Sequence, residues 1–176
     1  IEVGREVTKF KVGDRVLTSM EFGGLAEEAV ATEANVYHIP ASMPFTKAVA
    51  LNTAYNSVAA SLTWPHLLDI KPGQWLLVTG AAGGVGTAAI EIGRHLGATI
   101  IAAASSEAKQ AHARACGAHH VMGADAKLLR DRVMEISNGG VDRALDPVGG
   151  DVFRESLRCL KPEGRILPIG FASGEI

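Results

Sequence analysis

The stretch Trp75–Gly86, with the sequence WLLVTGAAGGVG, decides the fold of this 176-residue chain. Its first part, Trp75–Thr79, is the apolar run expected of a strand that is buried on both faces of a parallel sheet. A glycine-rich turn follows, and Val85–Leu96 then has the residue pattern of a helix. A buried strand that passes through such a turn into a helix predicts the opening of a βαβ unit.

Strand and helix patterns alternate from this stretch to the end of the chain. Strands that alternate with helices of about 10–15 residues are typical of a doubly wound parallel sheet. We therefore predict an α/β fold with a Rossmann-type sheet. Its further strands are expected at Ala98–Ala104, His119–Met122, Val141–Leu145 and Arg165–Ile169, and its further helices at Ser106–Cys116, Ala126–Ile136 and Asp151–Leu160.

The residues before this stretch have a different character. Short extended pieces separated by turns are expected at Arg15–Thr18, Leu25–Thr32 and Val36–Pro40, and an alanine-rich helix at Phe45–Thr63. The chain is therefore expected to have three parts. These are a β-rich segment over 1–44, a connecting helix region over 45–70 and the Rossmann domain over 71–176.

The composition is that of an ordinary globular protein, with 47% hydrophobic residues, 20% charged residues and a formal net charge of −2. The charges are mixed and form no basic block, so neither nucleic acid nor a membrane is an expected partner. The two cysteines, Cys116 and Cys159, lack the spacing of a metal site. They could pair, but the reading we prefer is buried thiols in a cytoplasmic protein.

The glycine-rich turn is the first candidate site, because it lies where a Rossmann unit binds the phosphates of a dinucleotide. Glycines let the backbone approach a pyrophosphate, and the N–H groups at the start of the helix hold its charge. Ala81 replaces the first glycine of the usual pattern, and the alternative is a plain structural turn. The residues expected to bind the cofactor here are Gly80, Ala82, Gly83, Gly84, Val85 and Gly86.

The end of the second strand bears on the choice of nucleotide. Rossmann units that bind NADH carry a carboxylate there, whereas this chain has Ala103-Ala104-Ser105-Ser106. Ser105 and Ser106 could donate hydrogen bonds to a 2′-phosphate and Lys109 could supply positive charge. Glu107 is expected in the first turn of the helix, where the dipole favours an acid. NADPH is therefore favoured over NADH, although Ser106 could also serve only as a helix N-cap.

Six segments follow one another in an order that resembles a known family. They are Val12–Val16, Lys71–Gly73, Gly80–Gly86, Ala103–Lys109, Asp146–Gly150 and Gly170–Gly174. Together they resemble the medium-chain dehydrogenase/reductase superfamily, in its zinc-independent, zeta-crystallin-like quinone oxidoreductase branch. The resemblance implies that the first part is the remainder of a GroES-like catalytic domain. It also implies an incomplete chain, with the sixth strand of the sheet missing.

The resemblance also implies roles for residues outside the glycine-rich turn. Tyr55 and Ser57 match the helix that faces the nicotinamide end, where Tyr55 is the candidate catalytic contact. Asp146 and Val148 match a loop beside the cofactor ribose, and the loop carrying Gly170, Phe171 and Ala172 matches one whose backbone meets the nicotinamide amide. No metal is expected, because the position aligned with a zinc-ligating cysteine holds Thr53 and the four-cysteine lobe of zinc enzymes has no counterpart.

The function implied is an oxidoreductase that transfers a hydride from NADPH to a quinone or to an activated carbon–carbon double bond, as a cytoplasmic homodimer. By itself, a chain lacking the first part of the catalytic domain would be inactive. Two alternatives stay open. The first is an enoyl or 2-alkenal reductase domain of a larger enzyme, and the second is a nucleotide-binding module without turnover.

Overall fold

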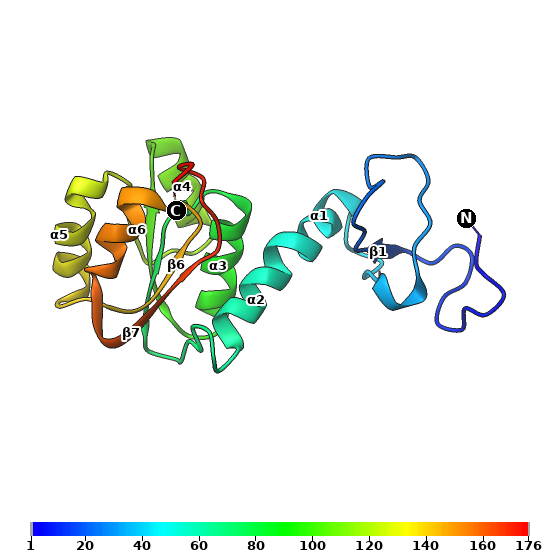
Figure 1. Ribbon diagram of the computed structural model, residues 1–176, viewed down its shortest axis with the longest axis horizontal. Coiled ribbons are helices and arrows are strands. Elements are labelled where there is room, and N and C mark those ends of the chain that lie inside the picture. The colour runs from blue at the N-terminus through cyan, green and yellow to red at the C-terminus, as the bar shows by residue number, and fades with distance from the viewer. Residues whose placement is uncertain (1, 176) are drawn as a thin grey trace. The chain divides into compact units, whose positions relative to one another are not determined.

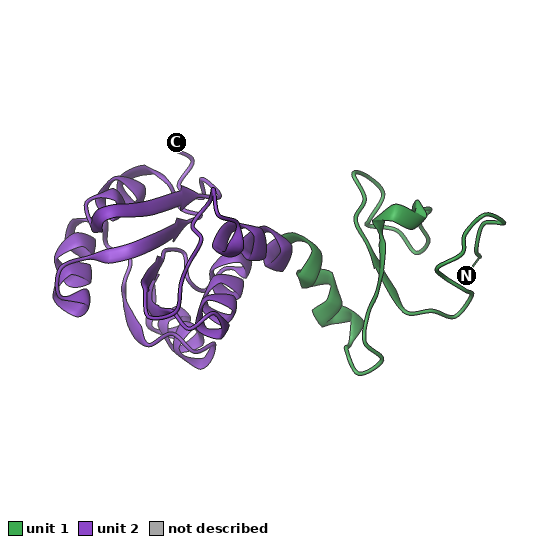
Figure 2. Cartoon of the chain, turned by 90° about the horizontal axis from the view of Figure 1, so that it is seen from below, with its two compact units in different colours: residues 1–53 green, residues 54–176 purple. Residues whose placement is uncertain are grey.

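The computed structural model describes residues 2–175. Contacts along the chain divide it into two compact units, residues 1–53 and 54–176, which Figure 2 shows in different colours.

The first unit contains one small antiparallel sheet. Strand β1 (Val16–Thr18) pairs with β2 (Val36–His38), which follows a short 3-10 helix, η1 (Glu33–Asn35). The extended piece predicted at Leu25–Thr32 is wrong, because this segment forms bends and pairs with no strand. Leu25 and Val30 are exposed there, so no packing favours a strand.

The helix predicted at Phe45–Thr63 is present, but its hydrogen-bond pattern changes along its length. It starts as α1 (Phe45–Ala50), continues as a π-helical segment, η2 (Leu51–Tyr55), and ends as α2 (Asn56–Thr63). Two arginines of the sheet hold the loop after α2. Arg165 donates to the carbonyl oxygens of Pro65 and Leu67 at 2.8 and 2.7 Å, and Arg143 donates to that of Leu68.

The second unit is built on a five-stranded sheet in the order β5-β4-β3-β6-β7, and each neighbouring pair is parallel. The strands are β3 (Trp75–Val78), β4 (Thr99–Ala104), β5 (His120–Gly123), β6 (Val141–Asp146) and β7 (Leu160–Pro168). The order reverses at β3, so the chain winds outward from the glycine-rich turn in both directions. The predicted doubly wound α/β sheet is confirmed.

Helices cover both faces of this sheet, as Figure 1 shows for α5 and α6 on one side and α2 and α3 on the other. The connecting helices are α3 (Gly84–His95), α4 (Glu107–Ala115), α5 (Ala126–Ser137) and α6 (Gly150–Leu157). One core lies under α2, α3 and α4, with Leu76 and Ile100 fully buried, and the other lies under α5, with Leu77 and Ile101. None of the helices between residues 2 and 175 is both long and apolar enough to traverse a membrane.

The last helix and strand differ from their predicted bounds. The helix expected to reach Leu160 ends at Leu157, and β7 begins at Leu160 rather than at Arg165. The cause is pairing with β6, since the Val141 N–H already donates to the carbonyl oxygen of Cys159 at 2.8 Å. A ladder contact between distant residues therefore takes priority over the local helical pattern.

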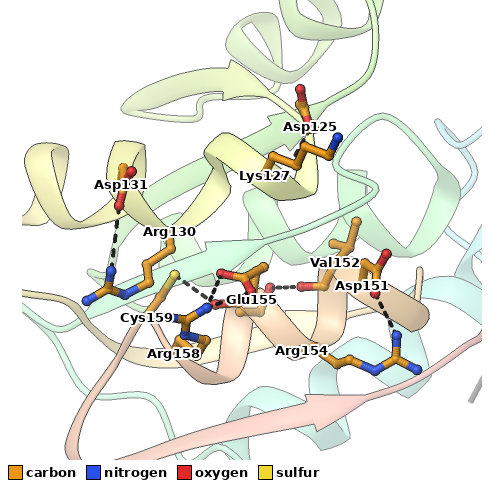
Figure 3. Close-up of polar contacts among 11 residues, drawn as sticks. Asp125, Lys127, Arg130, Asp131, Asp151, Val152, Arg154, Glu155, Arg158 and Cys159 are labelled. Atoms are coloured by element: carbon orange, nitrogen blue, oxygen red, sulfur yellow. Dashed lines mark hydrogen bonds and ion pairs between the residues drawn. The ribbon is translucent and has the colours of Figure 1, made fainter.

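The outer surface of α6 carries local ion pairs, which Figure 3 shows beside α5. Arg154 lies 2.6 Å from Asp151, and Arg158 lies 3.0 Å from Glu155. Both arginines are largely exposed, so each pair contributes about 0–1 kcal/mol. These contacts support the helix locally.

Candidate functional site

The turn between β3 and α3 brings two backbone segments unusually close together. A Cβ on Gly86 would lie 2.6 Å from the Cα of Ala81 and 2.7 Å from its carbonyl carbon, and would also meet the carbonyl oxygen of Gly80. Only a residue without a side chain allows this approach. The Gly83 N–H donates to the Gly80 carbonyl oxygen at 3.0 Å, which closes the turn.

The start of α3 is left open. Its N-cap is Gly83, which offers no side chain to the first-turn N–H groups, whereas Ser106 caps α4 and Asp125 caps α5 with side-chain oxygens. The first N–H groups of a helix lack partners within the helix, and the helix dipole makes this end positive. The open start of α3 therefore fits an anion such as a phosphate group.

Two cavities flank this turn at the carboxyl ends of the strands. The larger, of about 410 Å³, is bounded mainly by small apolar residues and extends to the end of β4. The smaller, of about 220 Å³, lies against the start of α3. The larger is lined by Gly80, Ala82, Gly83, Ala103, Ala104, Ser105, Lys109, Ala124, Val148 and Val152, and the smaller by Gly80, Gly83, Gly84, Val85, Gly86, Pro147, Val148 and Ala172.

Lys109 and Ser105 line the larger cavity after the end of β4, and Ser106 follows Ser105 as the cap of α4. The Lys109 ammonium donates to the Ser105 hydroxyl at 3.2 Å. The Ser106 hydroxyl accepts from the Lys109 N–H at 3.4 Å, so the predicted N-cap is confirmed. Glu107 lies in the first turn of α4, as expected, and the end of β4 itself carries no acid. This end of the cavity suits an anionic group.

The turn after β6 lies beside the glycine-rich turn. The Asp146 carboxylate is fully buried and accepts from the Thr79 hydroxyl, from the Val148 N–H at 3.1 Å and from the Gly149 N–H at 3.0 Å. The loop after β7 covers this turn, since the Ala172 N–H donates to the Pro147 carbonyl oxygen at 3.1 Å. The ends of β3, β6 and β7 thus form one continuous edge.

Tyr55 has a partner on α3. Its hydroxyl donates to a carboxylate oxygen of Glu91 at 2.6 Å. This hydrogen bond, with some burial, raises the pKa of Tyr55 to about 12. Ser57 is exposed on α2, and neither residue lines the two cavities.

Most of the residues chosen from the sequence meet at these cavities. Ser106 lies next to them as the cap of α4, while Gly170 and Phe171 belong to the covering loop without lining either cavity. Sequence reasoning did not name six residues of the site as binding residues, namely Thr79, Ala103, Ala104, Ala124, Pro147 and Val152. Thr79 and Pro147 directly adjoin predicted positions, but nothing in the local pattern of Ala124 or Val152 could have indicated a cavity wall.

Metal ligation has no geometric support in the part of the chain that the structure describes. Between residues 2 and 175, no three side chains of the His, Cys, Asp or Glu type come together as a metal site would require. Cys116 has one polar neighbour of this kind, the His112 ring nitrogen at 3.5 Å.

The family of the chain follows from its similarity to known proteins. The family described as zinc-binding dehydrogenase matches residues 84–176, which is more than half of the chain. This chain belongs to the medium-chain dehydrogenase/reductase superfamily. Within the superfamily its relatives place it in the quinone oxidoreductase branch, as the resemblance in the sequence predicts.

Three of the similar proteins show the extent of the likeness. A quinone oxidoreductase-like protein 2 homolog of Nematostella vectensis is 37% identical over 100% of this chain and 48% of its own length. A 2-haloacrylate reductase of Burkholderia is 34% identical over 98% of this chain and 53% of its own length. A mycobacterial protein solved in complex with NADPH is 30% identical, with a TM-score of 0.89 over 99% of this chain and 55% of the other. The chain thus spans about half the length of these relatives.

Proposed function

We propose that the two cavities bind a nicotinamide nucleotide, and that the nucleotide is NADPH rather than NADH. The observation that carries this proposal is the pairing of Lys109 with Ser105 at the end of β4, where the ammonium lies 3.2 Å from the hydroxyl. A 2′-phosphate there would gain charge-assisted hydrogen bonds, and no carboxylate at the end of β4 would repel it. The mycobacterial relative solved with NADPH supports the same choice.

The residues around the glycine-rich turn would hold the rest of the nucleotide. The uncapped N–H groups at the start of α3 would bind the pyrophosphate, since the turn brings backbone and helix dipole together there. The small apolar side chains of the larger cavity would enclose the adenosine part. Val148 borders both cavities and would therefore lie between the two halves of the nucleotide.

We propose that the complete protein is an oxidoreductase whose substrate is a quinone or an activated carbon–carbon double bond. The bound nucleotide would supply the hydride, while the chain binds the nucleotide, orients it and excludes water from it. The names of two relatives, a quinone oxidoreductase-like protein and a 2-haloacrylate reductase, support these two substrate classes.

A contact between Tyr55 or Ser57 and the reacting end of the nucleotide stays a prediction. The Tyr55 hydroxyl is engaged with Glu91, and a pKa of about 12 makes it a weak acid near neutral pH. We therefore assign no proton transfer to Tyr55. The homodimer also stays a prediction.

Binding of NADPH and NADH to matched variants tests the choice of nucleotide. Replacing Lys109 with alanine should weaken NADPH by about 10-fold or more, since a hydrogen bond to a charged group is worth about 1.5–3 kcal/mol. NADH should bind almost unchanged, because it lacks the 2′-phosphate. Lys47→Ala is the control, since it removes the same charge from an exposed position on α1. Equal losses for the two nucleotides would overturn the proposal of NADPH.

The reaction is tested by oxidation of NADPH with the complete gene product. Absorbance at the nicotinamide band should fall when a quinone or an α,β-unsaturated carbonyl compound is added. Binding of NADPH without turnover of either substrate class would instead support the alternative of a nucleotide-binding module.

A further inference from the structure

Asp146 is a carboxylic acid side chain without exposed surface, in the turn next to the two cavities. A buried carboxylate is costly unless hydrogen bonds compensate for the lost water. Three donors do so here. They are the Thr79 hydroxyl, the Val148 N–H at 3.1 Å and the Gly149 N–H at 3.0 Å.

These hydrogen bonds join the ends of β3 and β6 and brace the turn after β6. Thr79 directly follows β3 and precedes Gly80, while Asp146 is the last residue of β6. The backbone of Asp146 extends the connection to the end of β7, because its carbonyl oxygen accepts from the Ile169 N–H at 2.8 Å. Asp146 therefore fixes the position of the glycine-rich turn after β3 relative to the turns after β6 and β7.

The turn that Asp146 holds is in direct contact with the glycine-rich turn, which would bind the nucleotide. A Cβ on Gly80 would lie 3.0 Å from Pro147 Cγ and 3.2 Å from Val148 Cγ2, so the two turns touch. Val148 borders both cavities, and its N–H is one of the donors to Asp146. A shift of the Asp146 carboxylate would thus move the boundary between the cavities.

We infer that Asp146 is a positioning residue, which sets Val148 and the glycine-rich turn in place and does not itself contact the nucleotide. The inference rests on the proposed function, in which these cavities bind the nucleotide. It differs from the role implied by family resemblance, in which Asp146 lies beside the ribose as a binding residue. Full burial and three internal donors leave its oxygens no direct path to a ligand.

Thr79 distinguishes a positioning role from direct contact. Thr79→Val removes the hydroxyl that Asp146 accepts from but leaves the carboxylate in place. If Asp146 positions the turn, this variant should weaken NADPH by about 10-fold, and Thr79→Ser, which restores the hydroxyl, should recover wild-type affinity. If Asp146 binds the ribose directly, only Asp146→Asn should lose affinity.

A double-mutant cycle adds a readout that general destabilisation would not move. The losses of Thr79→Val and Asp146→Ala should not add in the double variant, because Asp146→Ala already removes the oxygen that accepts from the Thr79 hydroxyl. Ser137→Ala is the matched control. It also removes a buried side-chain hydrogen bond, to the Gly140 N–H at 2.9 Å, but at the amino ends of the strands. Its NADPH affinity should equal that of the wild type.

Amide hydrogen exchange of the ligand-free chain tests the inference separately from the proposed function. The amides of residues 148–151 should exchange faster in Thr79→Val than in the wild type and in Ser137→Ala. Absence of NADPH binding by the wild type would overturn the proposed function, and the exchange result would still decide whether Asp146 holds the turn. Unchanged exchange and unchanged affinity in Thr79→Val would overturn the inference.

Discussion

Gly86→Ala is the substitution that most sharply probes how the glycine-rich turn works. The added methyl carbon would lie 2.6 and 2.7 Å from two backbone atoms of Ala81. Carbon atoms pack at about 3.5–4.0 Å, so α3 would have to move by about 1 Å relative to the turn. The atoms in the way are backbone, and they cannot rotate aside as the end of a side chain could.

Two losses should follow from this displacement. Overpacking of this kind lowers the free energy of unfolding by about 1–3 kcal/mol, which urea titration measures. The start of α3 would also no longer meet the pyrophosphate correctly. We expect NADPH affinity to fall by about 10-fold or more, or about 1.4 kcal/mol, as followed by nicotinamide fluorescence.

Gly93→Ala separates the loss of binding from the loss of stability. A Cβ at Gly93 would lie 2.9 Å from Ile100 Cδ1 and from Leu76 Cδ2, so this variant overpacks the core on the same helix. It lies about two turns beyond the site, and should lose stability without losing NADPH affinity. Gly84→Ala, whose Cβ would be an ordinary 3.7 Å from Ala54 Cβ, should remain as stable as the wild type. The reasoning is refuted if Gly86→Ala binds NADPH as tightly as the wild type, or if Gly93→Ala loses as much affinity.

Further tests of separate parts of the account use Ser106, Tyr55 and the two cysteines. Ser106→Asp should keep the N-cap and the stability but shift the binding preference from NADPH towards NADH, and an unchanged ratio of the two affinities would contradict this. Ser106→Ala should lower the free energy of unfolding by about 1 kcal/mol, because it removes the cap. The raised pKa of Tyr55 means that the stability contributed by its hydroxyl is fully present below pH 10.0 and is lost as the pH rises through about 12. In an ultraviolet titration, Glu91→Gln should return the pKa of Tyr55 towards 10.0, and an unchanged pKa would show that Glu91 is not the cause. Burial raises the pKa of Cys159 to about 11, so a thiol reagent at neutral pH should modify Cys116 first and Cys159 only on unfolding. Equal modification rates for the two thiols would contradict the burial of Cys159.

The sequence predicts the sheet of the second unit well because its signals are local. Continuous apolar runs such as Trp75–Val78 and Thr99–Ala104 bury their side chains in a parallel sheet that is covered by helices on both faces. The cap of α4 could likewise be predicted from Ser106. Here pattern and structure agree because neighbouring residues determine the outcome.

The errors arise where distant residues decide. The start of β7 is set by pairing with Val141, which no pattern within Leu160–Pro168 reveals. The extended piece expected at Leu25–Thr32 has no partner strand.

The candidate site divides in the same way. The glycine-rich turn and the Ser105–Lys109 cluster are contiguous in the sequence and could be predicted. The hydrogen bond between Thr79 and Asp146 joins residues that lie 67 positions apart, and so does not follow from either local motif.

The central claim is that the two cavities bind NADPH through the start of α3 and the Ser105–Lys109 cluster. Its most direct test is a parallel titration of the wild-type chain with NADPH and NADH, followed by nicotinamide fluorescence and repeated with Lys109→Ala. The account predicts that NADPH binds more tightly than NADH and that the substitution removes most of this difference. Absence of binding by either nucleotide, or equal affinities in the wild type, would contradict it.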